Sequence, residues 1–425
     1  MKTTAVRMYG EMDLRLETFE LPEIKDDEIL VRVVSDSICM STFKLLEQGK
    51  LHKRAPQNID TNPIIIGHEM AGDIVQVGSK WADQFEAGQR FALQPALNYK
   101  GSLASPGYSY EFFGGASTYC IIPQEVMELG CLLVYEGDAY YEASLGEPMS
   151  CVIGGFNAVY HTNKRNYDHK MGIKENGNVL IMGGCGPMGL GAIDYLMQSD
   201  RHPKLVVVTD LSEDRIERAK KVLPIEVAKE KGITLIYHNP NNFEESTKTL
   251  MDYTDGYGYD DAFVYVPVAQ LVEEADGLLA FDGCLNFFAG PVDNQMKSKV
   301  NIYNVHYGNT KIMGSTGGNN ADLIEALTLS SQKRINPSVM VTHVGGMNAI
   351  AETSLNLPNI PGGKKLMYTH IDMPLTAISD FEALGKENLL FKKLHEVTAR
   401  DRGLWNAEAE RILLSHFNDF TKQSE

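Results

Sequence analysis

The sequence has no apolar stretch that approaches the roughly 20 residues that a transmembrane helix needs. Residues 1–11 also lack the apolar core of a secretory signal peptide. Positive charge is scarce, because 39 Lys and Arg stand against 56 Asp and Glu, a formal net charge of −17. An acidic surface disfavours nucleic acid and anionic membranes as partners. We therefore expect a cytoplasmic protein that binds neither.

Cysteine is sparse and scattered. The six cysteines stand at positions 39, 120, 131, 151, 185 and 284, and no two form a Cys-x-x-Cys pair. This spacing excludes a disulfide scaffold and a four-cysteine zinc knuckle. Most of these cysteines are expected to be buried as small apolar residues, and only Cys39 stands in a pattern that suggests chemistry.

The patterns along the chain divide it into two domains, as its length of 425 residues also suggests. We expect a β-rich first part at 1–157, a dinucleotide-binding domain at 158–335, and a return to the first domain at 336–425. Alternating short strands are predicted in the first part at 5–8, 14–17, 29–34, 73–77 and 90–93.

Strands and helices alternate in the second part, which predicts a doubly wound parallel sheet. Its strands are expected at 179–182, 205–210, 234–237, 261–266, 284–289 and 311–314. We expect a linking helix between Gly155 and Gly172. In the last part we expect a strand at 338–343 and helices around 378–384 and 412–417.

A strand, a glycine-rich turn and a helix are predicted where Val179–Met182 is followed by Gly184-x-Gly186-x-x-Gly189. In the dinucleotide fingerprint the first glycine permits the turn and the second lets backbone approach a pyrophosphate. The third lets helix and strand pack closely, and the helix N-terminus favours phosphate. Pro187 and Met188 lie inside this motif.

The next apolar strand ends in Asp210, at about the distance where the fingerprint places an acid that binds ribose hydroxyls. Its charge would repel a 2′-phosphate, so NAD is favoured and NADP remains possible. Arg215, five residues on, completes the predicted cofactor-binding set. The alternative is that Asp210 is a solvated cap of a helix that starts at Leu211.

Candidate metal ligands gather in the first part: Cys39 with Ser41 close behind, His68 and Glu69 in a Gly-His-Glu turn, and Glu147 before Pro148. Thiolate, imidazole and carboxylate are common zinc ligands, and three protein ligands leave an open catalytic position. Each also has an ordinary explanation: a core cysteine, a turn histidine, or an acid at a helix start.

Together these motifs resemble the medium-chain, zinc-dependent alcohol and polyol dehydrogenases. The resemblance covers nearly the whole chain and rests on Cys39-x-Ser41, Gly67-His68-Glu69-x-x-Gly72, Gly88-Gln89-Arg90-Phe91, Glu147-Pro148, Gly184-x-Gly186-x-x-Gly189 and Asp210. It implies a GroES-like β domain with a Rossmann domain. The Glu-Pro pair is similar to the polyol branch, and the long chain is most similar to sorbose 1-phosphate reductases.

The resemblance implies a role for each matching residue. Cys39, His68 and either Glu69 or Glu147 would hold the catalytic zinc, with the other acid nearby as an exchangeable ligand or water partner. Ser41 would begin a proton relay. Hydride would pass between the nicotinamide C4 and the substrate carbon.

Three departures from the family pattern carry expectations of their own. Thr42 stands where an aspartate often orients the zinc histidine, and Lys44 stands where some members have a relay histidine. The stretch Gln94 to Tyr119 has no cysteine, whereas many members place four there for a structural zinc. We therefore predict one zinc per chain.

The expected reaction interconverts a ketose phosphate and a hexitol phosphate, such as sorbose 1-phosphate and glucitol 6-phosphate. Lys53 and Arg54 in a basic loop are candidate phosphate ligands, although a merely solvated loop explains them as well. Alternatives are an unphosphorylated polyol or secondary alcohol as substrate, a zinc-free quinone reductase, and a non-catalytic nucleotide sensor. A homodimer or homotetramer is expected, with Cys284–Phe288 resembling a pairing sheet edge.

Overall fold

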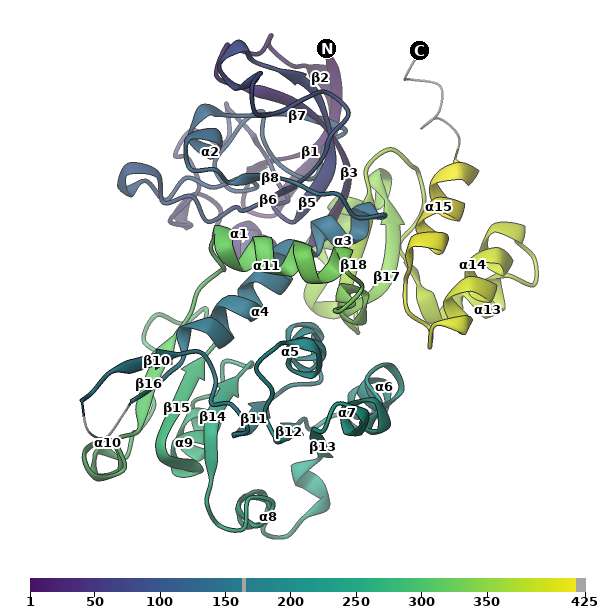
Figure 1. The fold of residues 1–425 in the computed structure, drawn as a ribbon. Coiled ribbons are helices and arrows are strands. Elements are labelled where there is room, and N and C mark those ends of the chain that lie inside the picture. Colours follow the sequence, from purple (N-terminus) through teal and green to yellow (C-terminus); the bar gives the residue numbers. More distant parts are fainter. Residues whose placement is uncertain (163–165, 418–425) are drawn as a thin grey trace. The chain divides into compact units, whose positions relative to one another are not determined.

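The computed structural model describes residues 1–162 and 166–417. The chain forms two compact units: the first unit holds residues 1–147, 323–333 and 341–425, and the second unit holds 148–322 and 334–340. The second unit is therefore inserted between parts of the first (Figure 1). The domain boundaries proposed from the sequence, after residues 157 and 335, stay a prediction.

The first unit is built on two sheets. A three-stranded sheet has the order β2-β1-β4, and an eight-stranded sheet has the order β19-β17-β18-β3-β5-β6-β8, with β7 also paired to β3. The strands are β1 (Lys2–Gly10), β2 (Asp13–Glu20), β3 (Ile29–Ile38), β4 (Ile64–Ile65), β5 (Met70–Val77), β6 (Arg90–Leu93), β7 (Tyr119–Ile122), β8 (Leu132–Val134), β17 (Val341–Gly346), β18 (Lys364–Tyr368) and β19 (Thr376–Ala377). All five strands predicted in this part of the chain are present.

Alternation along β3 explains how this sheet fills its core. Ile29, Val31 and Val33 point to one face and join a buried cluster with Phe91, because successive side chains of a strand face opposite sides. At its far end β3 pairs antiparallel with β18, so that Ile38 stands opposite Lys365. This register brings a strand near residue 364 beside the segment that leads to Cys39.

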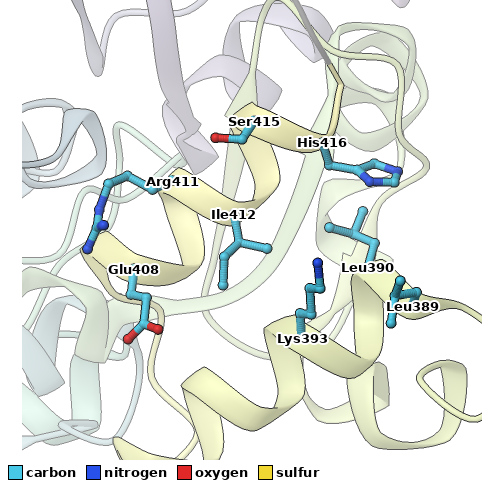
Figure 2. A pocket seen from close by; sticks show the side chains of 8 residues that line it. All are labelled: Leu389, Leu390, Lys393, Glu408, Arg411, Ile412, Ser415 and His416. Carbon is cyan, nitrogen blue, oxygen red and sulfur yellow. The ribbon is translucent and has the colours of Figure 1, made fainter.

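Short helices complete the first unit. They are α1 (Met40–Gln48), α2 (Gln124–Glu128), α3 (Tyr140–Ser144), α12 (Ile350–Leu355), α13 (Phe381–Leu384), α14 (Leu389–Arg400) and α15 (Ala407–His416). The predicted helices near 378–384 and 412–417 correspond to α13 and α15, whereas α14 was not predicted. A groove of about 480 Å³ lies between α14 and α15, where Lys393 and Ile412 face each other (Figure 2).

A buried acid ties α15 to the rest of the first unit. Glu410 accepts hydrogen bonds from the backbone N–H groups of Tyr140 and Tyr141 at 2.7 and 2.8 Å, and from the Tyr368 hydroxyl at 2.8 Å. The two amides are the free donors at the start of α3, where a carboxylate is favourable. Burial raises the pKa of Glu410 to about 7.

The second unit contains a six-stranded sheet with the order β13-β12-β11-β14-β15-β16, and every pairing in it is parallel. The strands are β11 (Asn178–Met182), β12 (Leu205–Thr209), β13 (Thr234–His238), β14 (Tyr259–Val264), β15 (Leu279–Phe287) and β16 (Lys311–Gly314). All six predicted strands are confirmed. The order reverses at β11, which is the doubly wound arrangement with its crevice at the strand ends.

Helices cover both faces of this sheet (Figure 1). Leu180, Val207 and Leu285 pack toward α8 (Ser246–Asp252) and α9 (Ala269–Gly277). On the other face Phe156 of α4 (Gly146–Ala158) contacts Phe263 with ring centroids 4.4 Å apart. The other helices of this unit are α5 (Pro187–Gln198), α6 (Glu213–Val222), α7 (Ile225–Glu230) and α10 (Ile302–Tyr307), whereas α11 (Asn320–Ser331) belongs mostly to the first unit.

The linking helix predicted between Gly155 and Gly172 is wrong. The helix is α4, which ends at Ala158, and the following residues form the hairpin β9 (Tyr160–Thr162) and β10 (His169–Met171), with 163–165 outside the described residues. Gly154 and Gly155 look like helix breakers, but each is a close-packing position. A Cβ there would lie 2.8 Å from Asp322 Oδ2 and 3.2 Å from the Phe288 ring.

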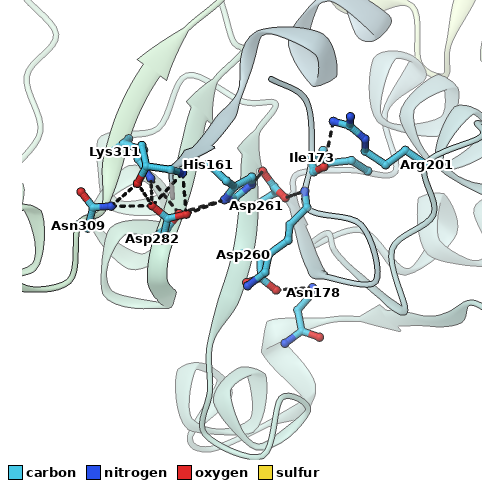
Figure 3. Close-up of polar contacts among 11 residues, drawn as sticks. His161, Ile173, Asn178, Arg201, Asp260, Asp261, Asp282, Asn309 and Lys311 are labelled. Carbon is cyan, nitrogen blue, oxygen red and sulfur yellow. Dashed lines mark hydrogen bonds and ion pairs between the residues drawn. The ribbon is translucent and has the colours of Figure 1, made fainter. Parts of the chain in front are cut away.

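The predicted pairing edge at Cys284–Phe288 is also wrong, because Cys284–Phe287 belong to β15, which is flanked by β14 and β16. Within the described chain the sheet ends at β16 instead. Beside it lies a polar cluster in which His161 contacts Asp261 at 3.1 Å and Asp282 at 3.4 Å (Figure 3). Lys311 of β16 pairs with Asp282 and closes the cluster.

Across residues 1–162 and 166–417, the structure contains no helix with the length and apolar character needed to cross a bilayer.

Candidate active site

Three predicted metal ligands meet at the end of β3. Cys39 directly follows β3 and precedes α1, while His68 and Glu69 occupy the turn between β4 and β5. One ligand atom each of Cys39, His68 and Glu69 lie within 4.8 Å of one another. Gly67 makes the turn possible with φ +88°, and a Cβ there would lie 2.3 Å from Asp36 Oδ2.

Glu69 is a buried carboxylate with a buried cation against it. Lys364 Nζ of β18 lies 2.5 and 2.6 Å from its two oxygens, and the Ser37 hydroxyl donates to Oε2. The side chains of Lys364 and Glu69 are only 6% and 1% exposed. Burial by itself lowers the pKa of Lys364, but the charge of Glu69 outweighs it and raises this pKa above its usual value. Lys364 therefore keeps its proton and its positive charge.

Glu147 lies at the start of α4 and is 8% exposed. Burial raises its pKa to about 7, and the negative charge of Glu69 adds to this effect. Its oxygens are not part of the close group formed by Cys39, His68 and Glu69. Glu147 is thus close enough for the charge of Glu69 to affect its pKa, but it does not belong to the close group of three ligand atoms.

Among the described residues, His68 has no acidic side chain hydrogen-bonded to its buried ring nitrogen Nδ1. Its Nδ1 is buried and has no hydrogen-bond partner among the described residues. Thr42, which replaces the expected aspartate, is buried at 3% exposure and cannot supply a negative charge. The imidazole is instead flanked by the ring of Tyr108, with centroids 5.1 Å apart.

Ser41 stands where a proton relay needs it. Its hydroxyl donates to Cys39 Sγ at 3.0 Å and lies 3.4 Å from His68 Nε2. The Tyr108 hydroxyl donates to Ser41 Oγ at 2.7 Å. Burial raises the pKa of Tyr108 well above its usual value, so this phenol keeps its proton.

The basic loop comes close to this group through one side chain. The Arg54 guanidinium lies 5.2 Å from the centroid of the Tyr108 ring, and His52 stacks on the same ring at 5.5 Å. Lys53 is exposed and Arg54 is half-buried. Within the described residues neither cation pairs with a carboxylate, whereas Lys50 is bound to Asp60 at 2.9 Å.

The glycine-rich turn has the geometry of a phosphate site, with one change in the assignment of roles. Gly183, and not Gly184, takes the positive φ of +69° that the turn requires. Gly186 caps the N-terminus of α5 and faces open space, since a Cβ there would meet nothing within 4 Å. A Cβ on Gly189 would lie 2.2 Å from Gly184 O, so only glycine lets α5 approach the strand. Pro187 and Met188 form the first turn of α5.

Asp210 is buried at 7% exposure, which rules out the solvated cap considered for it. Its carboxylate accepts from Cys185 N at 3.2 Å and from Ser212 N at 3.0 Å. Helix α6 starts at Glu213 with Ser212 as its N-cap. Arg215 lies in the first turn of this helix and is exposed.

Comparison with known proteins places these two sites in one family. The model of the alcohol dehydrogenase GroES-like domain matches residues 25–130, and that of the zinc-binding dehydrogenases matches residues 187–332. The chain belongs to the zinc-binding medium-chain dehydrogenases and is an oxidoreductase of that type. The predicted GroES-like and Rossmann folds are thereby confirmed.

Particular relatives share nearly the full length. Mannitol-1-phosphate 5-dehydrogenase of Aliivibrio fischeri is 51% identical over 417 residues, covering 98% of each chain. L-sorbose 1-phosphate reductase of Klebsiella pneumoniae is 47% identical over 419 residues, covering 99% of each chain. Sorbitol dehydrogenase of Bacillus subtilis is 28% identical over 51% of this chain and 58% of its own.

Solved structures agree on the fold. 2R,3R-butanediol dehydrogenase of Bacillus subtilis superposes with a TM-score of 0.69 at 20% identity, over 86% of this chain and 99% of its own. A zinc-binding dehydrogenase of Sinorhizobium meliloti bound to NADP has the same TM-score at 18% identity, over 87% and 99%. At these identities the likeness concerns the fold alone.

The residues fit the zinc ion that the family binds. A thiol, an imidazole and a carboxylate converge within 4.8 Å, which is a donor set of the catalytic type. Burial raises the pKa of the Cys39 thiol, with a further rise from the charge of Glu69. A bound cation would reverse this effect by favouring the thiolate.

Two members of the site were not predicted from the sequence. Tyr108 comes from the loop between β6 and β7 and had no motif to mark it. Lys364 had only a faint signal in the sequence, because it stands two residues before the apolar run Leu366–Tyr368. Its partner Glu69 is 295 residues away, so spacing along the chain could not reveal the pair.

Proposed function

We propose that this oxidoreductase interconverts a ketose phosphate and a hexitol phosphate, with sorbose 1-phosphate and glucitol 6-phosphate as the expected pair. The observation that carries the proposal is Arg54. Its guanidinium lies 5.2 Å from the centroid of the Tyr108 ring, and the Tyr108 hydroxyl is hydrogen-bonded to Ser41, so a cation with no carboxylate partner among the described residues contacts a ring that contacts Ser41. The two relatives of full length, whose names specify sugar phosphates, support the same substrate class.

The proposed roles follow the contacts. Cys39, His68 and Glu69 would hold one zinc, with Glu147 as the nearby exchangeable acid. Zinc supplies Lewis-acid polarisation of the reacting oxygen when bound. Ser41 would hold and transfer the proton of that oxygen. Gly186 and the first turn of α5 would bind the pyrophosphate of the nicotinamide cofactor. Asp210 would bind the ribose hydroxyls of NAD. Lys53 and Arg54 would bind the substrate phosphate.

The basic loop offers a direct test. The double variant K53A/R54A should raise KM for sorbose 1-phosphate at least tenfold, and it should lower kcat/KM for sorbose 1-phosphate at least tenfold more than kcat/KM for unphosphorylated sorbose, because only a phosphate needs the two cations. K50A is the matched control, since Lys50 lies in the same loop but is paired with Asp60. Equal KM values for the double variant and the wild type would contradict the proposal.

A second candidate is the same chemistry on an unphosphorylated polyol, which the likeness to sorbitol dehydrogenase favours. Metal-free protein titrated with zinc in the presence of NADH separates the two candidates. Activity with sorbose 1-phosphate at about one zinc per chain supports the first. Activity with sorbose alone would support the second. A C39S variant that kept full activity would overturn both.

The remaining features of the proposal concern stoichiometry and assembly. We propose one zinc per chain, because the stretch from Gln94 to Tyr119 has no cysteine that could bind a second one. Hydrogen bonds hold this loop in place instead, among them the bond from Ser105 Oγ to Pro95 O at 2.7 Å. A homo-oligomer, a cytoplasmic location and a preference for NAD over NADP stay predictions. Because β15 lies inside the sheet, we propose the edge strand β16 in place of Cys284–Phe288 as the pairing surface.

A further inference from the structure

The loop between β6 and β7, residues 94–118, lies against the metal-ligand turn. Ser109 Oγ donates to Arg54 O at 2.8 Å, and Ile65 N donates to Tyr110 O at 3.1 Å. Gly107 forms a bridge with Ile66. The loop is therefore fastened to both the basic loop and the segment that leads into His68.

Gly107 sets how close this approach is. It has φ +76°, and a Cβ at this position would lie 2.5 Å from Gly67 O, directly before His68. Such a distance is closer than real Cβ contacts allow, so any side chain at 107 would push the loop away. The next residue, Tyr108, is thereby placed against the His68 ring.

Tyr108 is held on all sides. It is 5% exposed, with His52 stacked on its ring at an interplanar angle of 16° and the Arg54 guanidinium near the same ring. The ring therefore has little freedom to turn, and its hydroxyl stays fixed on Ser41 Oγ at 2.7 Å.

This hydrogen bond controls where the Ser41 proton points. A serine hydroxyl has one proton and two acceptor lone pairs. Because Tyr108 donates to Ser41, the proton of Ser41 is left for its other neighbours, and it is donated to Cys39 Sγ at 3.0 Å, with His68 Nε2 3.4 Å away. Cys39 and His68 are two of the three residues that would hold the zinc.

We propose that Tyr108 is a positioning residue for proton transfer, which orients the Ser41 hydroxyl toward the Cys39 and His68 side of the site. The inference rests on the proposed role of Ser41 as the proton relay. The substrate can be either of the two proposed classes.

The test is Y108F, measured on the substrate that the wild type turns over. Without the phenol, Ser41 can turn its proton away, and kcat should fall roughly 10- to 100-fold, within what proton-transfer groups contribute. KM should change less than about threefold, and the pH profile of kcat should shift. Y110F is the matched control, because Tyr110 lies in the same loop but donates to Glu125 at 2.7 Å. It should behave as the wild type.

The double variant S41A/Y108F separates this role from a structural one. If Tyr108 acts through Ser41, the double variant is no slower than S41A alone, whereas independent effects multiply. Zinc content and thermal unfolding of Y108F check that the site stays assembled. A Y108F enzyme with wild-type kcat and pH profile overturns the inference, as does multiplication in the double variant. Wild-type protein inactive on every sugar phosphate would instead refute the proposed function.

Discussion

Lys364 and Glu69 illustrate, at the scale of single residues, how this site handles buried charge. Each alone would be a costly ion in the interior, and together they neutralise each other at 2.5 Å. The positive charge of Lys364 also makes the site less negative than Glu69, Glu147 and the Cys39 thiol would make it by themselves.

Removing the cation should therefore be expensive. K364M should lower the free energy of unfolding of the metal-free protein by about 3–5 kcal/mol, because the charge of Glu69 is left buried without a cation beside it. The double variant K364M/E69M should recover most of the loss. Urea unfolding measures both.

Arg15 provides the surface comparison for that experiment. It pairs with Asp13 at 2.7 Å, but the two side chains are 53% and 41% exposed. R15M should cost far less unfolding free energy than K364M, because exposed ion pairs contribute little. Equal losses of unfolding free energy in R15M and K364M would contradict the expectation that breaking the buried pair of Lys364 and Glu69 is the more destabilising change.

At the scale of elements, the β11–α5–β12 unit places Asp210 beside the glycine-rich turn. D210N removes the charge that would repel a 2′-phosphate while keeping one acceptor oxygen. Its kcat/KM with NAD should fall about tenfold or more, and the ratio of NAD to NADP use should fall further. Steady-state kinetics with both cofactors measure this.

Arg215 gives the complementary variant. If it is the residue that accommodates a 2′-phosphate, R215A should weaken use of NADP and leave NAD unaffected within about twofold. A D210N enzyme with an unchanged cofactor ratio would contradict the assignment of Asp210 to the ribose.

The loop from 94 to 118 offers a second test at this scale, with two glycines of similar conformation. Gly107 and Gly101 have φ +76° and +80°, but only at Gly107 would a Cβ clash. Each of the variants G107A and G101A should lose roughly 1–2 kcal/mol of unfolding free energy, because alanine is strained in the left-handed conformation. Only G107A should also lower kcat at least tenfold, since it displaces the loop from His68. Equal kcat values in the two variants would contradict this account.

The elements that the sequence predicted well are those whose signals are local. Strands β11 and β16 were located to within one residue, because a short apolar run ends in glycine. Strand β15 was placed too late, since Asp282 with φ +65° and Gly283 interrupt its pattern. Helix α4 was misplaced because its glycines serve packing.

The residues of the site also divide into those with a local signal in the sequence and those without one. Cys39, His68 and Glu69 stand in short motifs, so their meeting could be anticipated. Tyr108 and Lys364 act through contacts between distant segments, for which one sequence has no periodicity or spacing to read. The position of Gly107 makes sense only once Gly67 is known to lie beneath it.

At the scale of the whole molecule, stability in acid should depend on half-buried histidines. Burial lowers the pKa of His370 to about 4, with a further effect from Arg32, and burial lowers the pKa of His343 to about 4 with help from Lys365. A depressed folded-state pKa means that the stability is present above pH 6.5. It is lost as the pH falls toward 4, because the unfolded chain takes up the protons.

H370Q isolates one of these residues. Between pH 7 and pH 4.5 its free energy of unfolding should fall by roughly 2–3 kcal/mol less than that of the wild type. Because both proteins carry the same metal site, loss of zinc in acid cancels in the difference. H306Q, which changes an exposed histidine, is the control. Parallel pH curves for H370Q and the wild type would contradict the assignment.

The position of Lys364 also has a consequence for the order in which the protein is made. A ribosome releases Cys39, His68 and Glu69 early, but β18, which pairs with β3 and carries Lys364, emerges only after the complete second unit. The large sheet of the nascent first unit therefore stays incomplete until then, whereas all six strands of the parallel sheet in the second unit have already been made. Final closure of the ligand pocket belongs to the end of translation, when the cellular zinc supply first meets a finished site.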